Sequence, residues 1–145
     1  MLGHYTLRIW LVAFSFLLLP ACDETNVKLD VDDNKIPTFN FTGSGGIPFF
    51  FVSEIPSGDW VPTGPNQDKT LWKIVPTGSH GVIPFAPIKY GIVPEGFAQE
   101  EPNKGSPPPL EEGKFYEAGG PPIQMRHGYV RFTITAGKLV RIERR

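Results

Sequence analysis

The pattern of apolar and polar positions divides the chain into an apolar N-terminal run followed by many short alternating segments. The run covers residues 9–19 and is interrupted only by Ser15. Beyond it, apolar residues recur at every second position over short stretches that glycine and proline separate. Such alternation is typical of strands with one buried face. No stretch sustains apolar residues at helical spacing, so the pattern predicts an all-β protein.

About seven or eight short strands can be counted in this way, which is the number typical of a β-sandwich. The clearest are residues 36–42, 47–55, 70–75 and 88–93, with residues 129–135 and 138–144 as a final hairpin. In the first strand, Phe39 and Phe41 fall on one face. The second contains an unbroken apolar run from Phe49 to Val52, which indicates a central strand buried on both faces.

The final hairpin is predicted in the most detail. Gly137 follows Ala136 between the two strands and supplies the positive φ that a tight two-residue turn requires. Alternation directs Arg131 outward to solvent. The side chains expected to face inward are Val130, Phe132, Ile134, Val140 and Ile142.

Residues 1–22 have the order of a secretory signal. Arg8 supplies a positive charge, the apolar run follows, and the small residue Ala21 precedes the only cysteine, Cys22. The run falls short of the roughly 20 apolar residues that a membrane-spanning helix needs. We therefore expect export, with cleavage between Ala21 and Cys22.

The last residues of this segment resemble the lipobox of bacterial lipoproteins. Leu19, Ala21 and Cys22 match that pattern, whereas Pro20 replaces the small or aliphatic residue usual at its position. The resemblance implies a diacylglycerol linked to Cys22 through a thioether. It also implies acylation of the new amino terminus with a fatty acid such as palmitate. Each buried CH₂ contributes about 0.8 kcal/mol, so two or more chains anchor a protein firmly.

The resemblance further implies an exported protein, membrane-anchored by lipid at the bacterial cell envelope. An aspartate directly after the modified cysteine favours retention at the inner membrane in enteric bacteria, and Asp23 holds that position. Removal of residues 1–21 leaves 145 − 21 = 124 residues, the size of one domain. Residues 22–35 are predicted to be an acidic tether, with a short first strand around Leu29 as the alternative, and residues 36–145 to be the β-sandwich.

A second resemblance concerns the stretch from Leu110 to Tyr116. Its Leu-x-x-Gly-x-x-Tyr spacing is similar to the tyrosine corner of fibronectin type III and related immunoglobulin-like sandwiches, with Glu112 in place of the frequent proline. The resemblance implies that the Tyr116 hydroxyl bonds to backbone upstream, within an immunoglobulin-like β-sandwich. Trp72 is then a candidate core aromatic on an earlier strand.

Composition and motifs argue against several functions. The mature chain would carry 13 basic and 15 acidic side chains, a net charge near −2 that does not favour nucleic acid as a partner. His80 and His127 lie in glycine-containing stretches without a nearby carboxylate or thiolate, so no metal or other cofactor is expected. No serine stands in a nucleophile elbow or a Ser-x-x-Lys pair. We therefore do not expect an enzyme.

Two groups of residues remain as candidate contacts with a ligand or partner. One group is aromatic and comprises Trp60, Tyr90 and Tyr129, because aromatics on loops can stack on sugars or anchor a protein. The other comprises Arg131 and Arg141 on the final hairpin, where edge-strand charge that prevents aggregation is the competing explanation. The leading hypothesis is a lipid-anchored, non-enzymatic interaction or structural module with an envelope protein or polysaccharide as partner. The alternative is a carbohydrate- or peptide-binding lipoprotein.

Overall fold

Strands dominate the part of the chain that the computed structural model describes, which comprises residues 28–42, 46–56, 69–78, 83–84, 86–120 and 128–142. Eleven strands and no α-helix occur in these residues, which confirms the all-β prediction. In the same part of the chain, no helix has the length and hydropathy of a membrane span.

The larger sheet has six antiparallel strands. Their order across the sheet is β11 (Lys138–Arg141), β10 (Tyr129–Thr135), β9 (Phe115–Gly119), β4 (Phe50–Ile55), β5 (Thr70–Pro76) and β8 (Phe97–Glu101). β4 lies between β9 and β5, as expected of a central strand, and its residues are buried on both faces.

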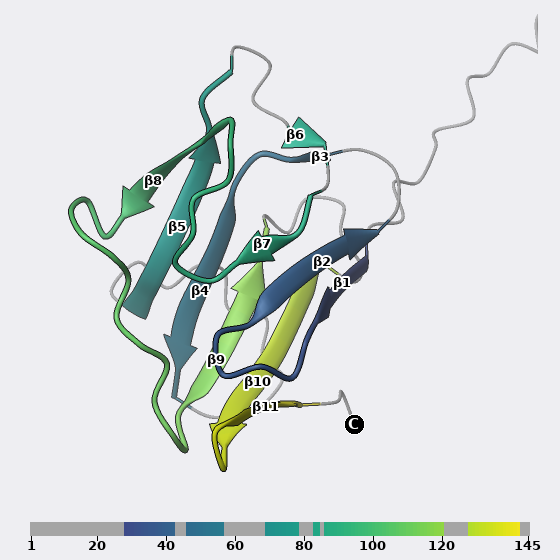
Figure 1. Cartoon of the computed structure of the whole chain (residues 1–145), viewed down its shortest axis with the longest axis vertical. Helices are drawn as coiled ribbons and strands as arrows, with labels where there is room; N and C mark the ends of the chain where they lie inside the picture. Colours follow the sequence, from purple (N-terminus) through teal and green to yellow (C-terminus); the bar gives the residue numbers. More distant parts are fainter. Residues whose placement is uncertain are drawn as a thin grey trace, which may run out of the picture.

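A second antiparallel sheet of three strands lies across the first (Figure 1). Its order is β1 (Lys28–Val31), β2 (Thr38–Thr42) and β7 (Ile88–Lys89). A separate two-stranded ladder joins β3 (Gly46–Ile47) to β6 (Ile83–Pro84). Two packed antiparallel sheets make the fold a β-sandwich.

Part of the strand order is similar to that of immunoglobulin-like sandwiches. In the seven-strand form of that fold, the first, second, fourth and fifth strands share one sheet, and the third, sixth and seventh share the other. Here β1, β2 and β7 form one sheet, and β4, β9 and β10 lie side by side in the other. β5, β8 and β11 extend the larger sheet at its two edges. Sandwiches without sequence similarity share this arrangement, so it defines a topology.

The core lies between the two sheets and is rich in aromatic rings. Phe39 and Phe41 both point into it, as the alternation predicted. Phe50 contacts both of these rings and also Trp72, with centroid distances of 5.0 to 5.9 Å. Trp72 is fully buried, which confirms it as a core aromatic. Pairs in tilted or edge-to-face geometry add roughly 0.5–1.5 kcal/mol each beyond the area that they bury.

The first strand starts earlier than the predicted domain boundary. Residues 28–31 form β1 and pair with β2, so that Leu29 lies opposite Phe41 and is buried. The structure therefore shows the short first strand that was the alternative prediction for these residues. They belong to the sandwich, and the tether interpretation does not hold for residues 28–35, because pairing with β2 hides the aliphatic side chains in the core.

Two other strands differ from the prediction. The expected strand at residues 88–93 contains only Ile88 and Lys89, because the chain turns at Tyr90 and at Gly91, whose φ is +76°. The turn leaves Ile92 56 % exposed. The alternation did not reveal β8, whose sequence Phe-Ala-Gln-Glu-Glu is mostly polar and lies at a sheet edge.

The final hairpin has the predicted turn and a different inward face on its second strand. Ala136 and Gly137 have φ values of +51° and +73°, as a two-residue turn of the primed type requires. The turn sets Leu139 opposite Ile134, so Leu139 is buried. Val140 is 47 % exposed, and its predicted inward position is wrong. The turn fixes the register and therefore the face.

Candidate functional site

The outer face of the six-stranded sheet carries a row of buried polar side chains. Val130 and Phe132 belong to the core, so Arg131 between them points to the opposite face. Cross-strand register places Arg131 beside Glu117, and Glu117 beside Ser53. The Ser53 hydroxyl lies 3.2 Å from that of Thr70 on the next strand. The row therefore crosses four strands, β10, β9, β4 and β5.

Arg131 and Glu117 form a buried ion pair within this row. The Arg131 Nε atom donates to the Glu117 Oε2 atom over 2.7 Å, and the two side chains are 2 % and 5 % exposed. Burial raises the pKa of the Glu117 carboxyl, and the hydrogen bond and charge of Arg131 act in the opposite direction. The prediction that Arg131 faces solvent is wrong. Its direction follows the alternation, but this part of the outer face is buried.

Tyr129 lies next to the pair on the same face. Its ring contacts that of Phe51 at a centroid distance of 5.9 Å. A Cβ atom on Gly119 would lie 2.3 Å from the Gly128 carbonyl oxygen and 2.7 Å from the Tyr129 ring, so only glycine fits beneath this ring. The Tyr129 hydroxyl is buried, and among the residues that the structure describes it has no hydrogen-bond partner. Burial, and secondarily the charge of Glu117, raises its pKa to about 12.

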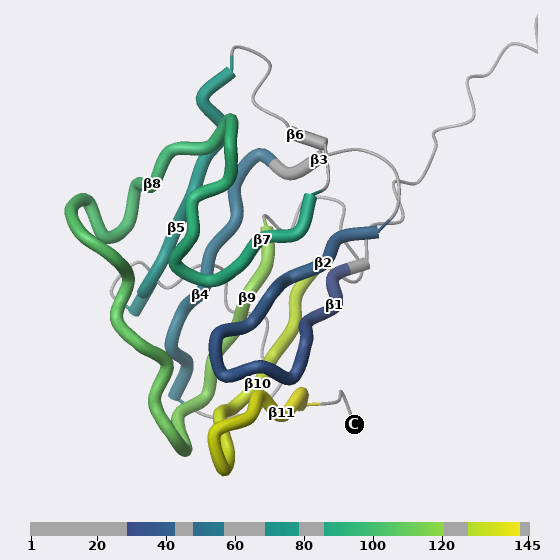
Figure 2. Tube along the Cα trace, viewed as in Figure 1, coloured from purple at the N-terminus to yellow at the C-terminus, as the bar shows by residue number. Residues whose placement is uncertain are grey.

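A second candidate feature is the connection between β8 and β9, residues 102–114, which we call the strap. Its trace runs along one side of the sandwich to the start of β9 (Figure 2). Gln99 holds its first part, because the amide donates to the carbonyl oxygens of Pro102 and Gly105 over 2.7 and 2.8 Å. The same amide accepts a hydrogen bond from the Trp72 indole over 3.1 Å. The strap is thereby tied to a core residue.

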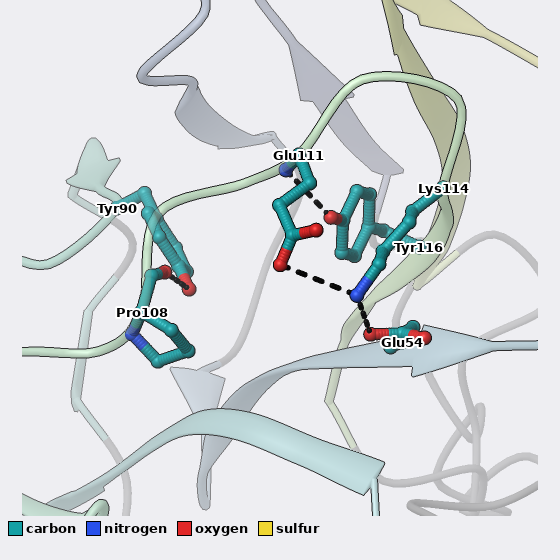
Figure 3. Close-up of polar contacts among 6 residues, drawn as sticks. All are labelled: Glu54, Tyr90, Pro108, Glu111, Lys114 and Tyr116. Atoms are coloured by element: carbon teal, nitrogen blue, oxygen red, sulfur yellow. Dashed lines mark hydrogen bonds and ion pairs between the residues drawn. The ribbon is translucent and has the colours of Figure 1, made fainter.

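Two tyrosines hold the later part of the strap (Figure 3). The Tyr90 hydroxyl donates to the carbonyl oxygen of Pro108, and the Glu111 amide donates to the Tyr116 hydroxyl, both over 2.8 Å. The second bond is the predicted tyrosine corner, which is confirmed. Burial raises the pKa of both hydroxyls. Leu110, buried at 4 %, fills the core between the two attachments.

Lys114 closes the end of the strap with two ion pairs. Its Nζ atom lies 3.1 Å from Glu54 Oε2 and 3.2 Å from Glu111 Oε1 (Figure 3). The hydrogen bonds to Glu54 and Glu111 raise the pKa of the Lys114 ammonium. Because solvent reaches all three side chains, the two ion pairs contribute little to stability and serve mainly to position the turn before β9.

The residues predicted from the sequence to contact a ligand or partner have different outcomes in the structure. Cys22, Ala21 and Trp60 lie outside the described residues. Tyr90 is 7 % exposed and is part of the core, so its side chain is not a surface contact. Arg141 is exposed on β11 and pairs with Asp30 of β1 over 3.0 Å, which links the edges of the two sheets.

Sequence reasoning missed the residues that organise both features. Glu117 follows the strongly apolar pair Phe115 and Tyr116 and gives no local sign of burial. Gln99 lies in the strand that was not predicted. The one signal in the sequence is that Glu117 and Arg131 each lie between two inward-facing residues of a strand. This signal indicates a buried pair only once the two strands are known to be neighbours.

No family model, no curated protein and no solved structure matches this chain. Within the described ranges, no group of three or more His, Cys, Asp or Glu side chains is arranged to hold a metal ion. In the described part, the buried Glu117 carboxylate pairs with the Arg131 guanidinium and so links two strands of the larger sheet. The strap is held to the sandwich by hydrogen bonds.

Proposed function

We propose that this chain is an exported lipoprotein, held at the bacterial cell envelope by acyl chains on Cys22. Its β-sandwich acts there as a non-enzymatic interaction or structural module. The observation that carries the proposal is the short interval between the lipobox-like sequence and the fold. Only residues 23–27 separate Cys22 from β1, which begins at Lys28. The attachment cysteine thus stands directly before the first strand of the sandwich.

The topology supports an interaction or structural role. Sandwiches with immunoglobulin-like strand order recur in cell-surface domains, where a rigid pair of sheets presents connecting loops to partners. In this chain the strap is fixed by the hydrogen bonds of Gln99, Tyr90 and Tyr116. Its exposed residues, which include Ser106, Pro108 and Pro109, are therefore displayed on a rigid support.

The carbohydrate- or peptide-binding alternative receives less support. It depends on loop aromatics, and Tyr90 is a core residue whose hydroxyl is used within the fold. The ring of Tyr129 packs on Phe51. Of the three aromatics, Trp60 remains the one on which this alternative depends.

Metabolic labelling with a radioactive fatty acid, in a bacterium that processes lipoproteins, tests the anchor. We expect the full chain to be labelled and recovered with membranes, and Cys22→Ser to be unlabelled and absent from the integral membrane fraction. The matched control is Pro20→Ala, which keeps Cys22 and should be labelled at least as strongly. An unlabelled wild-type chain, or labelling that survives Cys22→Ser, would contradict the proposal.

A further inference from the structure

The middle of the strap consists of three consecutive prolines, Pro107, Pro108 and Pro109. The proline ring fixes φ near about −65°, and a residue that precedes a proline is restricted to extended ψ values. Both conditions apply to Pro107 and Pro108, so this stretch adopts the polyproline II helix. In agreement, residues 106–111 belong to no strand and to no helix with internal hydrogen bonds.

Burial along the strap follows the period of this proline helix. A polyproline II helix has three residues per turn, so residues three apart share a face. Pro107 is partly buried, and Leu110, three residues later, is 4 % exposed and belongs to the core. The residues on the other two faces are all exposed: Ser106, Pro108, Pro109 and Glu111. One face of the helix therefore packs on the sandwich, and two faces point to solvent.

Hydrogen bonds hold the proline helix before, along and after its prolines. The Gln99 amide donates to two carbonyl oxygens at the start of the strap. The Tyr90 hydroxyl donates to the Pro108 carbonyl oxygen, and the Tyr116 hydroxyl accepts from the Glu111 amide (Figure 3). A ligand that is already fixed in its bound conformation loses less entropy on binding than a flexible peptide does. The sandwich thus presents the prolines in a fixed conformation.

Exposed aliphatic side chains adjoin the proline helix. Ile36 precedes the residue whose carbonyl oxygen accepts a hydrogen bond from the Tyr90 amide, and it is 56 % exposed. Ile92 and Val93 directly follow Gly91 and are also exposed. A Cβ atom on Gly91 would lie 3.5 Å from the ring of the first proline of the strap. The exposed prolines therefore have apolar neighbours on the surface of the sandwich.

We propose that the strap is the ligand of a partner protein whose aromatic-lined groove takes the exposed prolines as a polyproline II helix. This inference rests on the proposed role of the sandwich as an interaction module. Grooves of this kind exploit a helix that is formed before binding and costs little conformational entropy. Within the described residues, no hydrogen bond engages the carbonyl oxygens of Ser106 or Pro109. Both oxygens are therefore open to donors of the partner.

The charges around the proline helix favour a protein partner over a lipid surface. β8 and the strap up to Lys114, residues 97–114, contain four glutamates and two lysines. Glu111 and Glu112 directly follow the apolar stretch, and both are exposed. A negatively charged leaflet repels carboxylates, whereas a protein groove can offer basic side chains beside its aromatic rings.

Photocrosslinking in membranes isolated from the bacterium that produces the protein tests the inference. A photoreactive benzoylphenylalanine replaces Ser106, which leaves all three prolines in place, or replaces Asn40 of β2 in the control variant. Both residues are exposed, so neither change should disturb the fold. We expect several-fold more crosslinked partner protein from residue 106 than from residue 40. The crosslinked peptide of the partner should contain Trp, Tyr or Phe.

A decaproline peptide, which is a free polyproline II helix, serves as the competitor, and a Gly-Ser peptide of equal length is its control. Decaproline should remove most of the crosslinking from residue 106, and the Gly-Ser peptide should leave it unchanged. Pro108→Ala combined with Pro109→Ala should lower the crosslinking several-fold. Pro48→Ala, which changes an exposed proline outside the strap, should leave it unchanged.

Three results would overturn the inference. They are crosslinking from residue 106 no stronger than from residue 40, crosslinking to lipid or to a second copy of this chain, and crosslinking that decaproline leaves unchanged. In protein whose intact mass shows acylation, each of these results leaves the anchor intact. Decaproline-sensitive crosslinking in protein without acyl chains would support the partner and overturn the anchor.

Discussion

The two faces of the six-stranded sheet are built on different principles, although one alternating sequence supplies both. The inner face is apolar, and Val52, Ala118, Val130 and Phe132 pack there against the second sheet. The alternate positions point to the outer face and hold Ser53, Glu117 and Arg131, which are buried, and Tyr129, which is partly buried. The hydrophobic effect accounts for the first face, and cross-strand pairing of polar groups accounts for the second.

This difference shows that a side chain can point to the outer face of a sheet and still be shielded from solvent. Alternation fixes which way a side chain points. Whether water reaches it depends on what the rest of the chain places over that face. Arg131 points outward as alternation requires and is nevertheless 2 % exposed.

The largest expected effect comes from breaking the outer-face ion pair. Glu117→Leu leaves Arg131 buried without its carboxylate and should lower the free energy of unfolding by about 3–5 kcal/mol. Adding Arg131→Met to this variant removes the buried guanidinium that has lost Glu117 and should restore most of the loss, because well-packed apolar replacements of buried pairs are often neutral or stabilising. Urea unfolding of a chain of residues 22–145 measures the stability of both variants.

The single variant Arg131→Met completes the set, and the ion pair would lose its assigned role if the double variant were destabilised by the sum of the losses in Glu117→Leu and Arg131→Met. That result would mean that Glu117 and Arg131 act through other contacts and not chiefly through each other.

On the inner face, the hydroxyls that hold the strap should matter less. Tyr116→Phe removes the acceptor of the Glu111 amide and should cost about 1–2 kcal/mol of unfolding free energy. Tyr90→Phe removes the bond to the Pro108 carbonyl, which lies in an exposed residue that water can reach, and should cost about 0.5–1 kcal/mol. Thermal unfolding orders the two variants. A larger loss for Tyr90→Phe would show that the strap is held at its middle and not at the corner.

Alkaline titration examines tyrosines from both faces together. Tyr90, Tyr116 and Tyr129 are the tyrosines that follow Cys22, and burial raises the pKa of each above 10. Because the pKa of each hydroxyl is higher in the folded than in the unfolded state, the contribution of its protonated form to folding stability is complete below pH 10. It is lost as the pH rises through the folded value, which is about 12 for Tyr129.

A chain of residues 22–145 should therefore show less tyrosinate absorbance near pH 10 in its folded state than after unfolding. Tyrosinate should appear together with unfolding at higher pH. Reversible ionisation of a tyrosine near pH 10 in the folded protein would place that ring at the surface and contradict its burial.

The smallest effect concerns the turn that joins β10 to β11. Ala136 has a φ of +51°, which costs a residue with a Cβ about 1–2 kcal/mol. Ala136→Asn should raise the free energy of unfolding by about 0.5–1 kcal/mol, since Asn-Gly is the preferred pair for this turn. Ala136→Val, the matched control, should lower it, because a branched side chain tolerates positive φ poorly. Chemical denaturation measures the free energy of unfolding with Asn, Ala and Val at position 136. A higher stability with Val than with Asn would contradict the turn assignment.

Local patterns predicted the parts of the fold that depend on neighbours in the sequence. The alternation of Phe39 and Phe41 and the positive φ of Gly137 follow from short-range chemistry, and the burial of Trp72 was implied by the resemblance to immunoglobulin-like sandwiches. The tyrosine corner followed from the spacing of Leu110, Gly113 and Tyr116. Each of these needs only a few consecutive residues to be recognised.

The rest depended on pairing between distant segments. β1 is stable because Leu29 lies against Phe41, and β8 because it pairs with β5 at an edge. The burial of Arg131 requires Glu117 on a neighbouring strand. The inward face of β11 was set by the register of the turn and not by the aliphatic pattern alone. A single sequence does not contain these pairings explicitly.

The mass of the intact protein extracted from membranes tests the proposed lipid anchor on Cys22. We expect a chain that begins at Cys22 and is heavier than the unmodified polypeptide by a diacylglycerol and a further acyl chain. Fragmentation should place the added mass on Cys22. A chain that retains residues 1–21, or one that begins at Cys22 with no added mass, would contradict the lipid-anchored sandwich.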